Sequence, residues 1–552
     1  GLTWPLEQEG LRRFANGLDE IFVIEEKRPI IEPQIKEILY DLPSDNRPRV
    51  VGSTDETCAE LIPSYGVLSP AQITEALADR LSRYIDVPSI QSRLDFVRGR
   101  IQSPAASKSK RTPYFCSGCP HNTSTLTPEG TRTLAGIGCH TMAIWMDREN
   151  SVYTHMGAEG ANWLGQAPFT ETDHVFTNIG DGTYFHSGLL ALRAAVAGGV
   201  NMTYKILYND AVALAGGQPM DGPLDVPMIT RQVRAEGAGR IIVVSDEPDK
   251  YPLGADFASG VTIHHRDELD ELQRNLRHEK GISVLVYDQT CAAEKRRRRK
   301  RGEFPDPPRR VFINEAVCEG CGDCGRASNC VSLVPVETEF GRKRAIDQSA
   351  CNKDYSCLNG FCPALVTVHG GALHKRAALA EDETVFPPLP EPEIPNTATP
   401  YGIAIAGIGG TGVVTIGALL ATAAHMENKA ASLLEITGMA QKNGAVFAHL
   451  RIGDKANALH ALRLGPGSAN LLLGCDLVAS AGEETLAALT PGQSSAVVNR
   501  HETMTPNFLQ SPDLVFPGEE LVGALENAAG SDRTHVLEAT KIATALLGDS
   551  IA

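Results

Sequence analysis

Two polar residues in the middle of the chain, Asp181 and Asn209, carry oxygen atoms that could hold a divalent cation. Asp181 stands in a Gly-Asp-Gly-Thr turn, and Asn209 follows the next long apolar run. Mg²⁺ takes a few hard oxygen ligands from a protein and completes its shell with oxygens of a bound phosphate. The carboxylate of Asp181, the amide oxygen of Asn209 and the main-chain carbonyl of Ala211 could therefore hold a diphosphate through Mg²⁺.

The elements around this turn are predicted to bring the two residues together. Residues 175–179 read as a buried strand, 184–197 as a helix and 202–208 as a second strand. In open α/β sheets, ligands bind at the carboxyl ends of the strands, where both polar residues would lie. Glycines let the backbone approach a phosphate, and a second glycine-rich segment is predicted to close over the cofactor. The residues expected to bind the cofactor are Gly180, Asp181, Gly182, Thr183, Asn209, Ala211, Gly216 and Gly217.

This arrangement looks like the signature of a thiamine diphosphate (TPP) site. A Gly-Asp-Gly turn alone is weak, because it occurs in many plain turns. The flanking strands and the asparagine at the end of the second strand make the pattern specific.

Most of the 13 cysteines are clustered, and the first cluster lies close to this site in sequence. Cys116 and Cys119 form a C-x-x-C pair, Cys139 follows, and Cys291 comes just after a strand expected at residues 282–287. A disulfide framework would suit a small secreted domain, which this chain is not. Four cysteines that converge beside a TPP site indicate a [4Fe-4S] cluster, with zinc or plain buried thiols as the alternatives.

A second cluster of seven cysteines follows. Cys318, Cys321, Cys324 and the Cys362 that precedes a proline have the spacing of one ferredoxin-type [4Fe-4S] cluster, with zinc as the alternative. Cys330, Cys351 and Cys357 are then one ligand short of a normal second set. A second cluster here would need an unusual ligand or a three-iron form.

Two further segments allow more than one interpretation. The unbroken basic run 295–301 could be a solvated linker, a nuclear or nucleic-acid-binding arm, or a dock for an acidic electron carrier. Residues 401–406 read as a strand, followed by a glycine-rich turn at 407–412 and a helix at 413–425. This resembles a dinucleotide fingerprint, but beyond Glu435 no acidic residue closes the next strand. Tight packing of strand on helix, or a subunit contact, would explain the glycines equally well.

The bulk properties are those of a soluble protein. A formal net charge of −16 argues against a general nucleic-acid binder. No apolar run is long enough to cross a bilayer and no secretory signal is visible, so a cytoplasmic location is expected. The chain begins without methionine and ends inside a helical pattern at residues 534–547, which is typical of part of a longer protein.

The order of these motifs resembles the 2-oxoacid:ferredoxin oxidoreductases, and within them the long fused indolepyruvate type. The resemblance implies a multidomain α/β protein: a doubly wound parallel TPP-binding sheet, an inserted ferredoxin-like domain and a Rossmann-like gamma domain. Its expected parts are the end of a transketolase-C-like domain (1–65), a linker with one helix (66–112), the TPP domain (113–300), the ferredoxin-like domain (301–385), a proline-rich linker (386–400) and a truncated gamma domain (401–552).

The resemblance also implies the chemistry. An aryl 2-oxoacid would be oxidatively decarboxylated, coenzyme A would take the acyl group, and electrons would leave through [4Fe-4S] clusters to ferredoxin. His186, and less directly His121 and His140, are candidates to handle protons. The family's pyrimidine-binding half-site is not recognised in this sequence, and homo-oligomers are expected. The alternatives are a TPP-dependent decarboxylase or carboligase without external electron transfer, and a non-catalytic electron-transfer subunit.

Overall fold

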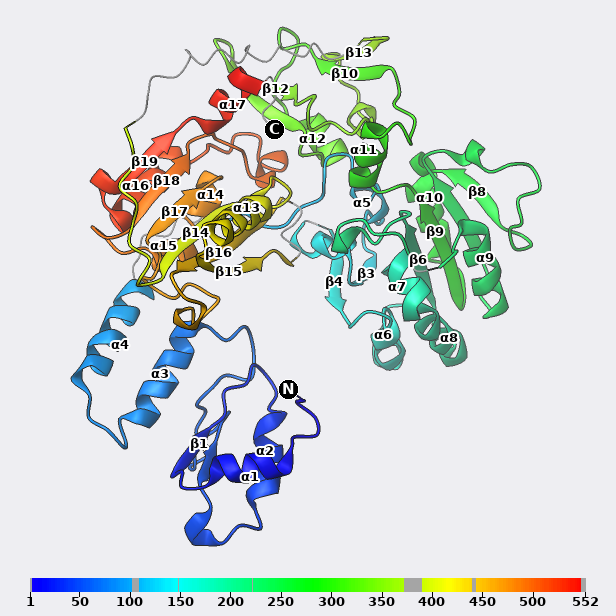
Figure 1. The fold of residues 1–552 in the computed structure, drawn as a ribbon. Coiled ribbons are helices and arrows are strands. Elements are labelled where there is room, and N and C mark those ends of the chain that lie inside the picture. The colour runs from blue at the N-terminus through cyan, green and yellow to red at the C-terminus, as the bar shows by residue number, and fades with distance from the viewer. Residues whose placement is uncertain are drawn as a thin grey trace.

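The computed structural model describes residues 2–101, 109–146, 148–220, 222–371, 390–438 and 443–547. Figure 1 shows two large sheets, a cysteine-rich segment near both of them and a small N-terminal α/β unit. In the part of the chain that is described, no helix combines the length and the apolar character needed to cross a bilayer.

The larger sheet is parallel throughout, as predicted. Its strand order is β4-β3-β5-β6-β9-β7-β8. The strands are β3 Arg132–Ala135, β4 Asn150–Tyr153, β5 Val175–Gly180, β6 Met202–Tyr208, β7 Ile241–Ser245, β8 Thr262–His265 and β9 Ile282–Asp288. β7 and β9 are buried along their whole length and β5 in all but its last residue, which explains their continuous apolar composition.

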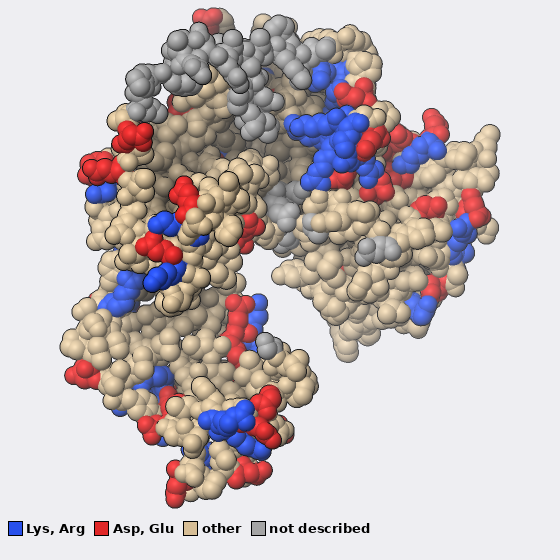
Figure 2. All heavy atoms as spheres, in the orientation of Figure 1, with Lys and Arg blue, Asp and Glu red and all other residues tan. Residues whose placement is uncertain are grey.

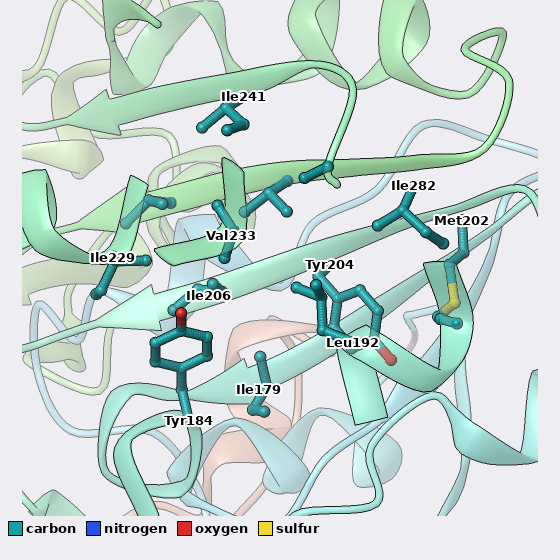
Figure 3. Close-up of a cluster of buried hydrophobic side chains, with 14 of the residues drawn as sticks. Ile179, Tyr184, Leu192, Met202, Tyr204, Ile206, Ile229, Val233, Ile241 and Ile282 are labelled. Carbon is teal, nitrogen blue, oxygen red and sulfur yellow. The ribbon is translucent and has the colours of Figure 1, made fainter. Parts of the chain in front are cut away.

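Helices cover both faces of this sheet. One core contains side chains of α8 (Leu189–Gly198) and α9 (Val226–Ala235), among them Leu192 and Ile229, packed on Ile179 of β5 (Figure 3). The other core packs α10 (Leu269–Leu276) against Phe176, which points to the opposite face of β5. Burying each such side chain contributes roughly 1.5–3 kcal/mol. The sheet is therefore doubly wound.

The C-terminal sheet differs from an all-parallel Rossmann-like sheet. Its order is β15-β16-β14-β17-β18-β19, and β16 runs antiparallel to both of its neighbours. The strands are β14 Tyr401–Ile408, β15 Ala430–Ile436, β16 Ala445–Gly453, β17 Leu471–Gly474, β18 Ser495–Asn499 and β19 Thr534–Leu537. The helical pattern expected at 534–547 is thus wrong in its first part, since only α17 (Ala539–Leu547) is helical.

The glycine-rich turn after β14 serves packing. A Cβ atom on Gly407 would come within 2.6 Å of Val413 Cγ2 and 3.0 Å of Cys475 Cβ. Glu435 is exposed on β15, which is separated from β14 by β16. The geometry therefore favours close contact between β14 and α13 (Val413–Met426) over a dinucleotide site.

The N-terminal unit consists of α1 (Gln8–Ala15), β1 (Glu20–Phe22), α2 (Ile31–Leu39) and β2 (Arg49–Val51), with the two strands parallel. The segment 66–112 contains two helices, α3 (Pro70–Leu81) and α4 (Pro88–Ile101), where one was predicted. Ser69 caps α3 as expected. The second helix has only a weak apolar face, with Leu94 and Val97 buried, which explains why its pattern was missed.

The cysteine-rich segment is built from short elements. Two antiparallel hairpins pair β10 (Arg309–Ile313) with β13 (Leu365–His369) and β11 (Leu333–Thr338) with β12 (Gly341–Ile346). Helix α12 (Asp323–Ser328) and a 3-10 turn (Ser356–Leu358) lie against each other. Residues 372–385 of the predicted ferredoxin-like domain and 386–389 of the predicted linker lie outside the described residues.

The basic run is part of a helix, α11 (Ala292–Lys300), and not a linker. Figure 2 shows its blue side chains gathered next to red ones. Arg298 pairs with Asp210 at 2.5 Å, and Arg299 donates to the carbonyl of Asn352 at 2.9 Å. The helix therefore joins the TPP-type sheet to the cysteine-rich segment through contacts inside this chain.

Candidate functional site

Asp181 links the ends of two neighbouring strands. β5 and β6 pair in parallel with Gly180 opposite Leu207, so the residues that follow them meet. Asp181 Oδ2 accepts the amides of Asn209 at 2.8 Å and Asp210 at 3.0 Å, and Oδ1 accepts the amide of Gly182 at 2.8 Å. Burial raises the pKa of Asp181 to about 6 despite these donors. The carboxylate is thus fixed in place but poorly solvated, and a cation would stabilise its charge.

Asn209 supplies the observation that fits a cation. Its Oδ1 is buried, and no described group donates to it. The carbonyl of Ala211 accepts the amide of Ala213 at 2.8 Å and retains a second lone pair. Together with Asp181 these are hard oxygen donors, which suit Mg²⁺ when a diphosphate supplies the remaining ligands.

The second glycine-rich segment lies beside this site and is held by α11. Val212 N donates to Gln218 O at 2.8 Å, which closes the loop that contains Gly216 and Gly217. Arg297 donates to the carbonyl of Gly216. The loop is therefore fixed at its base, while Arg298 holds the chain just before it through Asp210.

The four predicted proximal cysteines come together. One largely apolar cavity is lined by Cys116, Cys119, Cys139 and Cys291. Asn209 lines the same cavity, and its carbonyl accepts the amide of Cys291 at 3.0 Å. Burial, followed by the neighbouring thiols, raises the pKa of Cys119. Asn209 thus connects the cysteine cavity directly to the Asp181 carboxylate.

The three histidine candidates have different surroundings. His140 is buried, lies 3.6 Å from the Cβ position of Gly180 and has an unpartnered Nε2 among the described residues. Burial lowers the pKa of His140 to about 4 and also lowers the pKa of His121, whose ring centroid is 5.7 Å away. His186, ranked first from the sequence, is exposed and contacts Ser187 at 2.9 Å. His140 is thus the candidate that contacts the turn.

Sequence reasoning did not single out Glu159. This side chain is fully buried, its Oε2 accepts the amide of Gly157 at 2.7 Å, and its Oε1 has no partner among the described residues. Burial raises the pKa of Glu159. A Cβ atom on Gly136 would come within 2.8 Å of His140 Nε2 and 3.0 Å of Glu159 Cγ, so both side chains face this glycine. The sequence does contain one signal for Glu159, which is an acidic residue inside a glycine-rich segment.

The remaining cysteines form two groups. Cys318, Cys324 and Cys362 share an apolar cluster, whereas Cys321 is exposed. Cys330, Cys351 and Cys357 line a separate cavity together with Gly118 of the proximal loop. The amide of Gly118 donates to the sulfur of Cys330. The two cavities therefore lie on either side of the loop between Cys116 and Cys119.

The arrangement of these cysteines bears on the zinc alternative. No three His, Cys, Asp or Glu side chains within the described ranges are arranged to hold a single metal ion. A structural zinc needs four ligands about 2.3 Å from one point, whereas a cubane holds each cysteine on a separate iron. The four cysteines that share the proximal cavity are the number that one cubane takes.

Three protein-family descriptions match separate parts of the chain. "Indolepyruvate oxidoreductase domain" matches residues 1–100. "Thiamine pyrophosphate enzyme, C-terminal TPP binding domain" matches residues 136–287, which contain nearly all of the larger sheet. "Pyruvate ferredoxin/flavodoxin oxidoreductase" matches residues 402–552.

Similar proteins come from archaea. The indolepyruvate oxidoreductase subunit IorA of Thermococcus kodakarensis is 26% identical over 388 residues, or 66% of this chain and 55% of that protein. Subunit IorB of Methanothermobacter thermautotrophicus is 30% identical over 135 residues, or 24% of this chain and 64% of that protein. The chain spans about half the length of the IorA proteins it matches.

Among solved structures, the 2-oxoglutarate:ferredoxin oxidoreductase from Magnetococcus marinus aligns with 34% of this chain and 67% of its own, at 17% identity. Its TM-score of 0.25 is too low to support any inference. On the three family matches and the IorA relatives, the chain belongs to the 2-oxoacid:ferredoxin oxidoreductase superfamily, and within it to the indolepyruvate type.

Proposed function

We propose that this chain carries the cofactor site and the electron route of an enzyme that oxidatively decarboxylates an aryl 2-oxoacid resembling indolepyruvate. The products would be the aryl-acetyl-CoA, CO₂ and reduced ferredoxin. TPP, Mg²⁺ and [4Fe-4S] clusters are the proposed cofactors. The names of the IorA relatives and of the family that matches residues 1–100 support this substrate class.

One observation carries this proposal: Asn209 belongs to two sites at once. Its amide donates to the Asp181 carboxylate at 2.8 Å, and its carbonyl accepts the amide of Cys291 at 3.0 Å. A cofactor anchored at Asp181 would lie one residue away from the cavity of the proximal cysteines. A decarboxylase or carboligase without electron transfer has no need for such a neighbour.

Several residues of this chain have a specific role in the proposed reaction. TPP, when bound, supplies the carbanion chemistry that decarboxylates a 2-oxoacid. Asp181, Asn209 and Ala211 would hold its diphosphate through Mg²⁺, and the loop that contains Gly216 would lie next to it. His140 is neutral at pH 7 and can exchange a proton at its Nε2, which has no partner among the described residues, and this makes it the favoured proton carrier over His121 and His186.

The proposed electron route follows the two cavities. The proximal cysteines hold the first acceptor beside the TPP site. The loop between Cys116 and Cys119 separates it from the cavity of Cys330, Cys351 and Cys357, because Gly118 lines that cavity. The set of Cys318, Cys321, Cys324 and Cys362 would be the exit toward ferredoxin.

Anaerobic purification tests this function. We expect the protein to contain iron and acid-labile sulfide for at least two four-iron clusters, and to bind TPP only with a divalent cation. With coenzyme A and ferredoxin, indolepyruvate and phenylpyruvate should be oxidised faster than aliphatic 2-oxoacids. A protein that binds TPP but holds no iron would instead be a lyase or carboligase, and one that holds iron but never binds TPP would be an electron-transfer subunit.

A further inference from the structure

The second cavity of the cysteine-rich segment contains three cysteines and one carboxylate. Cys330, Cys351, Cys357 and Asp354 all line it. In sequence, Asp354 stands midway between Cys351 and Cys357, at the position that the middle cysteine would occupy in a C-x2-C-x2-C loop. The first loop has a cysteine, Cys321, at that position.

The two loops share a left-handed backbone conformation at two corresponding positions. In the first loop, Gly320 and Gly322 have φ angles of 74° and 81°. In the second loop, the corresponding residues Lys353 and Tyr355 have φ angles of 55° and 66°. A left-handed conformation is strained for a residue other than glycine. The second loop therefore keeps the shape of a cluster-binding loop although its residues disfavour that shape.

The hydrogen bonds to sulfur are repeated as well. Gly320 N donates to Cys318 Sγ at 3.4 Å, and Lys353 N donates to Cys351 Sγ at 3.4 Å. Backbone N–H groups directed at the sulfurs are one of the features that tune protein iron–sulfur sites. Asp354 is consequently aligned with Cys321 by φ angles and by sulfur contacts, in addition to spacing.

We propose that Asp354 is the fourth ligand of an iron–sulfur cluster held by Cys330, Cys351 and Cys357. This inference rests on the proposed function, which makes the cysteine-rich segment an electron carrier. Asp354 would bind one iron through Oδ2. Its Oδ1 is held by Arg266 Nη1 at 2.5 Å and by Gln289 Nε2 at 2.8 Å, both from the TPP-type domain.

The oxygen ligand makes one iron different from the other three. Carboxylate is a harder ligand than thiolate and holds iron of an iron–sulfur cluster less firmly. A one-electron oxidant such as ferricyanide then converts [4Fe-4S]²⁺ to [3Fe-4S]⁺, with Fe²⁺ released and ferricyanide reduced to ferrocyanide. This cluster would lose one iron under oxidation, while the two all-cysteine clusters keep theirs.

The alternative role for Asp354 is a salt bridge with Arg266 that joins two domains. Three variants separate the two roles: Asp354→Asn, Asp354→Cys and Arg266→Gln. Asp323→Asn, at an exposed position of the first loop, is the matched control. All are purified anaerobically as the full chain, and iron content and EPR spectra are recorded before and after limited ferricyanide.

We expect Asp354→Asn to contain about one iron fewer per chain before any oxidant is added, because loss of Fe²⁺ from [4Fe-4S]²⁺ leaves a reduced three-iron cluster, [3Fe-4S]⁰, with an integer-spin EPR signal. Wild type, Asp323→Asn and Arg266→Gln should show a three-iron signal, that of [3Fe-4S]⁺, only after ferricyanide. Asp354→Cys should resist the conversion, which is a gain that misfolding cannot mimic.

Two outcomes overturn the inference. The first is an Asp354→Asn variant that keeps the wild-type iron content and shows no three-iron signal before ferricyanide, as is expected of Arg266→Gln. The second is a wild-type chain whose iron is confined to the other two cysteine sets, which leaves the proposed function standing. A chain without any iron–sulfur cluster would overturn this inference and the proposed function together.

Discussion

Replacement of Asn209 by leucine should change stability and cofactor binding in opposite directions. Asn209 Oδ1 is buried without a donor among the described residues, and an unpartnered acceptor costs about 1–3 kcal/mol. Leucine has a similar size and lacks the acceptor. In the absence of metal and cofactor, Asn209→Leu should therefore raise the free energy of unfolding by up to about 1–3 kcal/mol.

The same substitution removes a proposed ligand of the cation. A hydrogen bond or contact to a charged group contributes about 1.5–3 kcal/mol, so the Kd for TPP with Mg²⁺ should rise by roughly ten- to a hundredfold. Denaturant titration measures the first effect and isothermal titration calorimetry the second. A residue that only supported the fold would not give effects of opposite sign.

Asn150 of β4 provides a matched control. Its Oδ1 and Nδ2 are also buried without partners among the described residues, but it lies in the edge strand away from Asp181. Asn150→Leu should also stabilise the cofactor-free protein and leave the Kd unchanged. The reasoning is refuted if Asn209→Leu binds TPP and Mg²⁺ as tightly as the wild type does.

Three further predictions follow from the site and the fold. Cys291→Ser should lose about four irons per chain. Its TPP affinity should stay within about twofold of the wild type, because the serine keeps the backbone amide that bonds to Asn209. Iron analysis checks this prediction, and the control variant Cys475→Ser should lose no iron. Gly136→Ala places a Cβ atom 2.2 Å from the carbonyl oxygen of Asn178. This clash should lower the free energy of unfolding by about 1–3 kcal/mol and displace His140. A lower denaturation midpoint and weaker TPP binding would show the two effects. Burial lowers the pKa of His449 to about 4. Its contribution of about 3 kcal/mol to the free energy of unfolding is therefore complete above pH 6.5 and is lost as the pH falls toward 4. His449→Gln should flatten the pH dependence of unfolding in that range, and an unchanged acid profile would show that His449 does not titrate in this way.

The sequence was informative where one local rule decides the structure. Apolar runs predicted the strands on either side of Asp181, and parallel pairing then brings Asp181 and Asn209 together. The spacing of Cys116 and Cys119 and the position of Cys291 after β9 predicted the proximal set, which shares one cavity.

The predictions were wrong or incomplete where contacts between residues far apart in sequence decide the structure. The basic run became a helix because its arginines find partners at Asp210, Gly216 and Asn352, none of which is near it in sequence. The sequence ranked His186 first, whereas His140 is the histidine that lies against Gly136 and Gly180, a contact that cannot be read from neighbouring residues; which histidine carries the proton stays a prediction. The antiparallel β16 was not anticipated for the same reason, since strand direction is set by pairing across the sheet.

In the proposed function, the diphosphate site and the proximal cluster share Asn209. Asp181 and Cys291 each bond directly to this residue, so their sites are separated by a distance on the order of 10 Å. With Mn²⁺ in place of Mg²⁺ and TPP bound, pulsed EPR on the anaerobic, reduced protein should detect strong magnetic coupling between Mn²⁺ and the cluster, and Cys291→Ser should abolish it. Mn²⁺ that binds with TPP but shows no coupling to any cluster would contradict the account.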